Sequence, residues 1–185
     1  MQALLRVSKG IDALNEFIGR IAYWLVPLVV AVGVWNTMTR YIGRATGQIL
    51  GSNFYIEAQW YLFTLIAFLG GAYNLLHNEH VRVDVLYGSW SPRQKAWANL
   101  IGALLILIPF CVLIIYFSWP AITNSWQIRE SSPDPGGLPR YPIKTIIPIA
   151  FGLLIAQGIS EIIKNAAFLS GQGSFMEEHN ESKAL

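Results

Sequence analysis

The sequence predicts an all-α integral membrane protein with four transmembrane helices, an N-terminal amphipathic helix and an interfacial segment between the second and third spans. The 185-residue chain is 54% hydrophobic and only 13% charged, whereas about 25% of an ordinary soluble domain is charged. A bilayer core about 30 Å thick requires roughly 20 apolar residues in a helix. Four stretches of about this length or longer contain no charged residue, namely 21–39, 58–76, 96–128 and 145–160.

The composition also excludes several functional classes. So little charge does not suit a soluble multidomain enzyme or a nucleic-acid binder. The net charge of +2 is too small to indicate an anionic macromolecular partner. The long charge-free stretches make membrane lipid the expected surroundings of the chain. The single cysteine, Cys111, lies in an apolar run, and we interpret it as a buried thiol.

Residues 1–20 predict an amphipathic helix. Apolar side chains recur at alternating three- and four-residue spacing, and the charged residues lie elsewhere on the helical wheel. Such a helix lies in the headgroup plane or packs along a partner helix, and the first arrangement is the more common beside a membrane span. The apolar positions are Leu4, Val7, Ile11, Leu14, Ile18 and Ile21.

The first two spans are expected at residues 21–39 and 58–76. Trp24 and Trp35 lie near the ends of the first span, where tryptophan is enriched at membrane interfaces. The connecting residues 41–57 are polar and contain three glycines, which predicts a short loop with an interfacial tail.

A polar segment at residues 77–95 follows the second span. Its charged side chains alternate with valines, so the segment can dock against the membrane or a protein while exposing its charges. Ser91 followed by Pro92 is typical of a helix start, with a capping serine and a proline at the first helical position.

The third and fourth spans are expected at residues 96–122 and 143–163. Pro109 predicts a kink in the third helix, and Pro120 is expected to mark its exit from the membrane. The proline- and glycine-rich residues 129–144 predict an irregular loop. The fourth span carries a stripe of small residues that favours close helix contact, Gly152, Ala156 and Ser160.

The expected domain organisation is an amphipathic helix at 1–20, a four-helix membrane domain at 21–168 and a polar, mobile tail at 171–185. The N-terminal segment, residues 77–95 and the C-terminal tail together hold eight Lys and Arg residues, and the other two loops hold five. Because positive residues favour the cytoplasmic side, both termini are expected in the cytoplasm.

The polar residues after the second span invite a metal-binding interpretation, which the spacing does not favour. His77, Glu79 and His80 do not follow the His-Glu-x-x-His pattern of zinc hydrolases, and only Asp84 is nearby as a further ligand. Haem would require histidines within the spans, but the remaining one, His179, lies in the tail. We therefore expect no catalytic, cofactor or metal site in this chain, and no enzyme activity.

Ionisable residues in the middle of a span would indicate an ion or proton path. None lies in the central turns of the four expected spans, so the sequence favours a scaffold or assembly subunit of a membrane complex.

Three separated motifs resemble one known family. They are Glu57-Ala-Gln-Trp-Tyr-Leu-Phe with Phe68-Leu-Gly-Gly-Ala, then His80-Val-Arg-Val-Asp-Val-Leu86, and Gly136-Gly-Leu-Pro-Arg-Tyr-Pro-Ile-Lys144 with Ile147-Pro-Ile. Together with the order of the spans, over residues 10–168, they resemble the small membrane subunit (DctQ type) of tripartite ATP-independent periplasmic (TRAP) transporters.

The resemblance implies a secondary transporter of the bacterial inner membrane. Its parts would be a periplasmic solute-binding protein, a large elevator-type permease that carries the sodium and substrate sites, and this small scaffold subunit. The usual cargo would be an organic acid. The polar motif positions would brace the helix ends or contact a partner, and they are Glu57, His80, Arg82, Asp84, Arg140 and Lys144.

A second hypothesis stays open, that of an independent small carrier or channel that acts as a homo-oligomer. In this case the amphipathic N-terminus and the small-residue stripe of the fourth span would form contacts between copies.

Overall fold

The computed structural model describes residues 2–48, 51–79 and 87–171, and these residues form long helices joined by short loops. Among them the pairing of extended backbone is limited to one isolated bridge between Ser131 and Pro139. The elements are α1 (Gln2–Thr46), α2 (Asn53–Leu76), α4 (Pro92–Gly102), the π-helical turn η1 (Ala103–Leu107), α5 (Ile108–Gln127), α6 (Arg140–Lys144) and α7 (Ile146–Leu169).

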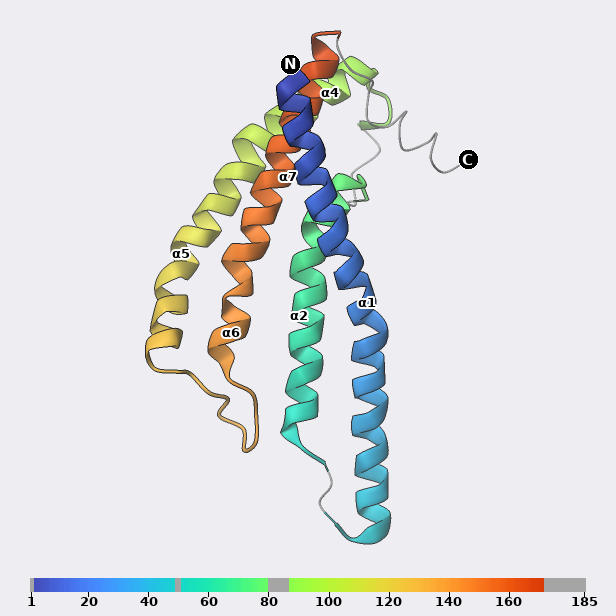
Figure 1. The fold of residues 1–185 in the computed structure, drawn as a ribbon, viewed down its shortest axis with the longest axis vertical. Coiled ribbons are helices and arrows are strands. Elements are labelled where there is room, and N and C mark those ends of the chain that lie inside the picture. The colour runs from blue at the N-terminus through green and yellow to red at the C-terminus, as the bar shows by residue number, and fades with distance from the viewer. Residues whose placement is uncertain (1, 49–50, 80–86, 172–185) are drawn as a thin grey trace.

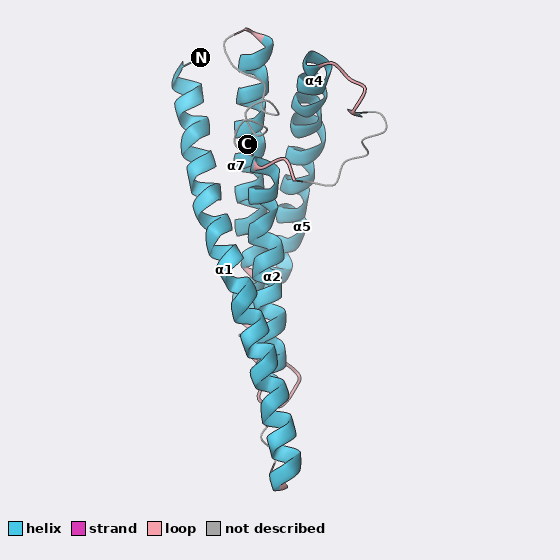
Figure 2. Ribbon diagram, turned by 90° about the vertical axis from the view of Figure 1, so that its right-hand side faces the viewer, coloured by secondary structure: helices cyan, strands magenta, loops and turns pink. Residues whose placement is uncertain are grey.

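The helices run side by side in an elongated bundle (Figures 1 and 2). α2 and α7 lie in the middle, α1 packs against both of them, and α4, η1 and α5 pack against α7. α1 and α4 begin at the end of the bundle where α7 ends, and we call this the N-terminal end (Figure 1). The opposite end, where α5 ends and α6 begins, is the loop end (Figure 1).

α1 is one continuous helix of 45 residues, about 68 Å long. The boundary expected at residue 20, between an amphipathic helix and the first span, is therefore not present in the structure. The helix also continues past Arg40 to Thr46, into residues expected to form a loop. A separate amphipathic helix is thus not confirmed, because the segment is the first part of the spanning helix.

The first part of α1 is oriented with its polar face inward. Ser8 and Asn15 are each only 1% exposed, whereas Leu4 and Val7 on the apolar face are about half exposed. This is the reverse of an amphipathic helix packed on a soluble core. The polar side chains are buried because they find hydrogen-bond partners on α7.

The expected start of the third helix is confirmed. The Ser91 side chain accepts from the Gln94 backbone, and the Gln94 side chain accepts from the Ser91 backbone, which completes a capping box before Pro92.

Just before Pro109, where a kink was expected, the helix contains the π-helical turn η1, in which Ile108 N–H donates to the carbonyl of Ala103, five residues back. The kink itself stays a prediction. Pro120 does not end the helix, since α5 continues to Gln127.

Three helical stretches are long and apolar enough to cross a membrane, namely Gln2–Thr46, Pro92–Gln127 and Arg140–Leu169. α2 has 24 residues and is also long enough, at about 36 Å, but it contains more polar side chains, including Gln59, Thr64 and Asn74. The expected count of four spans therefore stays a prediction. His80, Arg82 and Asp84, and the tail beyond residue 171, lie outside the described residues.

Candidate functional site

Glu57 organises the loop end of the bundle. It lies in the second turn of α2, is 9% exposed, and accepts hydrogen bonds from the Ser132 hydroxyl and the Leu138 backbone N–H. These bonds, together with the charge of Arg140, hold the pKa of Glu57 below its usual range despite the opposing effect of burial. The carboxylate thus joins α2 to a loop about 80 residues away in the sequence.

The loop that Glu57 binds, residues 128–139, is folded onto α2, and we call it the docked loop. Ser132 N–H donates to the Leu138 carbonyl at 3.2 Å, which closes the loop on itself. The Tyr61 hydroxyl donates to the Pro139 carbonyl at 2.9 Å, and the Asn53 amide donates to the Pro135 carbonyl at 3.1 Å. The loop predicted from prolines and glycines therefore has a defined conformation.

Gly137 allows the close approach of the docked loop to Glu57. A Cβ atom at this position would lie 2.5 Å from Ser132 Cβ and 2.7 Å from Glu57 Oε1. Both distances are shorter than real Cβ contacts, so a side chain here would displace the loop or the carboxylate. The neighbouring Gly136 is required for a different reason, because it adopts a positive φ of 75°, which favours glycine.

A second ion pair secures the base of the docked loop. The Lys144 ammonium and the Ser125 hydroxyl both donate to Glu130, and the Arg140 backbone N–H donates to the Glu130 carbonyl at 2.8 Å. Lys144 and Ser125 lower the pKa of the Glu130 side chain. The structure thus brings three of the predicted positions, Glu57, Arg140 and Lys144, to one end of the bundle.

A polar network joins α1 to α7 at the N-terminal end, and the sequence analysis did not identify it. Asn15 Nδ2 donates to Gln157 Oε1 at 2.7 Å, and Gln157 Nε2 donates to Asp12 Oδ1 at 3.1 Å. Asp12 also accepts from Ser160 at 2.7 Å and pairs with Lys164 at 2.6 Å. We call these residues, together with Ser8 and Glu161, the α1–α7 network.

A signal for this network is present in the sequence. Ser8, Asp12, Asn15 and Gly19 recur at three- and four-residue spacing, which places them on one helix face. Gln157, Glu161 and Lys164 do the same in α7. On α1 the apolar stripe of residues 4–21 suggested the buried face, and on α7 the sequence indicated only the small-residue stripe that includes Ser160.

α1 also contacts the end of α2 through charged and aromatic side chains. Glu16 Oε2 lies 2.7 Å from His77 Nε2, and Glu16 Oε1 accepts from Arg20 at 3.0 Å. The Tyr73 ring packs against His77 and fills the space over Gly19. His77, which we considered as a metal ligand, pairs with a carboxylate, and the described residues hold no group of three or more potential metal ligands.

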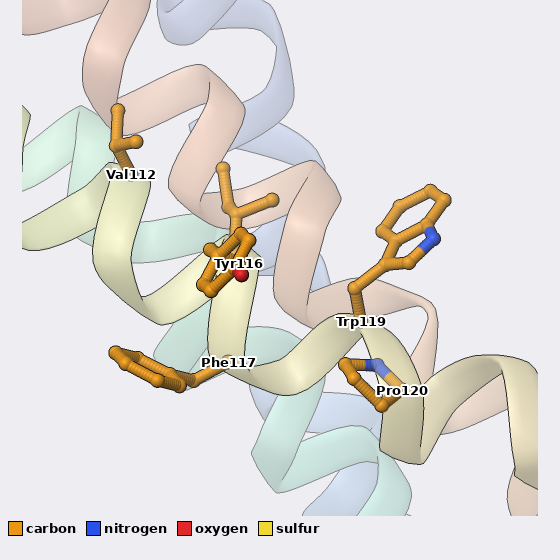
Figure 3. Close-up of a pocket in the computed structure, with 6 residues that line it drawn as sticks. Val112, Tyr116, Phe117, Trp119 and Pro120 are labelled. Carbon is orange, nitrogen blue, oxygen red and sulfur yellow. The ribbon is translucent and has the colours of Figure 1, made fainter.

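Large apolar and aromatic side chains are exposed on the outer surface of α1, α2, α4, η1, α5 and α7. On α5, an apolar hollow of about 560 Å³ lies beside Pro120. Figure 3 shows Tyr116, Phe117 and Trp119 projecting from the helix around this proline. Tyr116 and Phe117 are about 70% exposed, as expected for side chains that lipid or a membrane partner covers.

The arrangement of charged ends and an apolar exterior is that of a membrane subunit, and a comparison with protein families identifies which one. The family model of the DctQ component of tripartite ATP-independent periplasmic transporters matches residues 18–168. The chain belongs to this family. Searches of the curated proteins and of the solved structures return no match.

The DctQ match covers all the helices that form the bundle, apart from the first turns of α1 and the last residue of α7. The resemblance predicted from the three motifs is therefore confirmed. The chain is a multi-pass inner-membrane component of a TRAP transporter. The docked loop and the α7 side of the α1–α7 network lie within the DctQ region, whereas Ser8, Asp12 and Asn15 precede it.

Proposed function

We propose that this chain is the small scaffold subunit of a sodium-coupled TRAP transporter that imports an organic acid. A periplasmic binding protein delivers the solute, and the large elevator-type permease subunit holds the sodium ions and the solute. The DctQ match over residues 18–168 is the observation that carries this proposal.

The contacts of the polar groups favour a structural role for this subunit. Asp12 and Lys164 pair with each other between α1 and α7, and Glu57 binds the docked loop. Glu130 and Lys144 pair at the base of that loop. These groups hold helices and loops together, which suits a static element against which a larger subunit moves.

The proposal includes an orientation. The N-terminal end of the bundle faces the cytoplasm, because the connections on that side carry more Lys and Arg residues. The docked loop then faces the periplasm, where it offers a rigid surface to the binding protein or to the large subunit.

One surface expected to join copies of the chain in an independent carrier is partly buried within the chain. Ser160, part of the small-residue stripe expected to join copies of the chain, is fully buried and bonds to Ser8 and Asp12 of α1. Part of the stripe is therefore used within the chain.

Reconstitution tests the proposed function. The chain is co-expressed with the large permease subunit of a TRAP transporter, purified and placed in liposomes with the binding protein, and uptake of labelled organic acids is measured with and without a sodium gradient. Uptake should require both membrane subunits and the gradient. Uptake by liposomes that contain only this chain would refute the proposal and support the independent carrier.

A further inference from the structure

A groove of about 470 Å³ runs along the outside of α1 where this helix packs beside α2, and we call it the α1–α2 groove. Its walls are mostly apolar, and Val30 and Val34 are 59% and 54% exposed. The residues of the groove that matter below are Val30, Gly33, Val34 and Thr37 of α1 and Gln59 of α2.

The Gln59 amide is the polar group of α2 in this groove. It rests on the backbone of α1 at Gly33, where a Cβ atom would lie 2.6 Å from Gln59 Nε2. Within the described residues the amide makes no hydrogen bond, although Gln59 begins a charge-free stretch of 19 residues. An amide in such surroundings needs a partner from outside the chain, and hydrocarbon supplies none.

Two arginines follow the groove along α1. Arg40 and Arg44 are the first charged residues after the charge-free stretch 21–39, both are exposed, and neither forms an ion pair within the described residues. At 100° per residue they fall within about 60° of Gly33 and Thr37, on the same side of the helix. The Arg40 side chain lies toward α2, because a Cβ atom at Gly51 would be 3.2 Å from Arg40 Cγ.

The chemical groups along this side of α1 follow the order of a phospholipid molecule. The apolar walls near Val30 match an acyl chain, the amide and hydroxyl at residues 33–37 match the ester linkages, and the arginines match a phosphate. Arg40 is about 5 Å from Thr37 and about 10 Å from Gly33 along the helix. These separations bracket the headgroup layer, which is about 5–8 Å thick.

We propose that the α1–α2 groove binds an anionic glycerophospholipid. Its phosphate lies against Arg40 and Arg44, an ester carbonyl accepts a hydrogen bond from the Gln59 amide, and one acyl chain follows the wall formed by Val30 and Val34. Two arginines without an ion pair favour an anionic headgroup over a zwitterionic one. The inference depends on the membrane location of the chain and goes beyond the proposed scaffold function.

Lipid titrations of the purified full-length chain in detergent test the arginines. The dissociation constant of the first bound lipid is measured by native mass spectrometry, and phosphatidylglycerol should bind at least about tenfold more tightly than phosphatidylethanolamine. Arg40→Gln combined with Arg44→Gln should raise the dissociation constant of phosphatidylglycerol at least about tenfold. Arg6→Gln combined with Arg93→Gln is the matched control, because it removes the same charge from exposed positions outside the groove, and it should change the constant by less than about twofold.

A substitution of the amide tests the second contact. Gln59→Met should raise the dissociation constant of phosphatidylglycerol about threefold to tenfold, from the loss of one hydrogen bond. Gln127→Met, at an exposed position near the end of α5, should leave the constant unchanged. Both variants should unfold at the wild-type temperature in lipid-free detergent, which separates lipid binding from folding.

Photo-crosslinking in nanodiscs identifies the occupant. In a bilayer of phosphatidylethanolamine with a minor fraction of phosphatidylglycerol, benzoylphenylalanine at position 34 should form adducts enriched in phosphatidylglycerol. At position 113, where Leu113 is also about half exposed, the adducts should follow the composition of the bilayer. Three results overturn the inference: the same lipid ratio at both positions, equal affinity for the two lipids, or a protein adduct in place of lipid at position 34 in cells.

Discussion

Gln157 is fully buried between α1 and α7, and its replacement by methionine tests whether the α1–α7 network holds the bundle together. Methionine has nearly the same length and volume, so Gln157→Met removes the hydrogen bonds and leaves the packing in place. The Asn15 amide then loses its only partner among the described residues, since Asn15 Oδ1 has none there either. Asp12 loses one of three partners and keeps Ser160 and Lys164.

The expected loss of stability follows from these bonds. A buried amide left without a partner costs about 1–3 kcal/mol, whereas hydrogen bonds between helices in membranes average about 0.6 kcal/mol and reach about 1.7 kcal/mol. For the two bonds made to Asn15 and Asp12, we expect Gln157→Met to lower the free energy of unfolding by about 1–3 kcal/mol.

The assay is equilibrium unfolding in mixed detergent micelles, followed by circular dichroism. Gln59→Met is the matched control, because the Gln59 amide makes no hydrogen bond within the described residues and lies in a groove between α1 and α2. It should change the free energy by less than about 0.5 kcal/mol. A double-mutant cycle of Asn15→Ala with Gln157→Ala should give a coupling energy near 1 kcal/mol. Equal stability of Gln157→Met and Gln59→Met, with no coupling, would show that apolar packing alone joins α1 to α7.

Three further predictions concern the helix contact and the docked loop. Gly19→Ala should destabilise the bundle by about 1–3 kcal/mol in the same assay, because the new Cβ would lie 2.0 Å from the Tyr73 ring. The control Gly10→Ala, which has open space around it, should stabilise the bundle by about 0.5–1 kcal/mol. Equal effects of the two substitutions would refute the contact between Gly19 and Tyr73. The stability that Glu57 contributes is present above about pH 4.5 and is lost as the pH falls below it, because its folded pKa is depressed. Limited pepsin digestion, normalised at each pH to an unfolded reference substrate, should therefore cut the docked loop relatively faster as the pH falls, and Glu57→Gln should abolish this relative increase. Lys144→Gln should raise the pKa of Glu130 in a carbon-13 NMR titration, and an unchanged pKa would contradict the ion pair.

The helices themselves were largely predictable from local patterns. Long charge-free runs require helices in a membrane, and the Ser91–Pro92 start depends only on neighbouring residues. The ends of α1 were not predictable in the same way. Polar residues before residue 21 and after residue 39 suggested a boundary and a loop, but the helix continues because its polar side chains are paired on α7 or lie exposed at the loop end.

The polar positions were identified individually but not as partners. Glu57, Arg140 and Lys144 stood out because of the family motifs, yet Ser132 and Glu130, which bind two of them, carried no signal of their own. Asn15 and Gln157 each belong to a polar helix face that the spacing shows, but their pairing was not predictable, since a hydrogen bond across 142 residues has no local pattern.

A helical membrane protein was predictable from the sequence, because hydrocarbon thickness and backbone hydrogen bonding leave few alternatives for long uncharged stretches. The motifs then indicated the DctQ family, which the family match confirms. Which face of each helix is inside became clear from the packed helices. In a soluble core the apolar stripe of α1 would be buried, but in a membrane subunit lipid and partner proteins also cover apolar surface. The interior of this bundle is therefore chosen by the polar groups that need one another, Ser8, Asp12 and Asn15 with Gln157, Ser160 and Lys164.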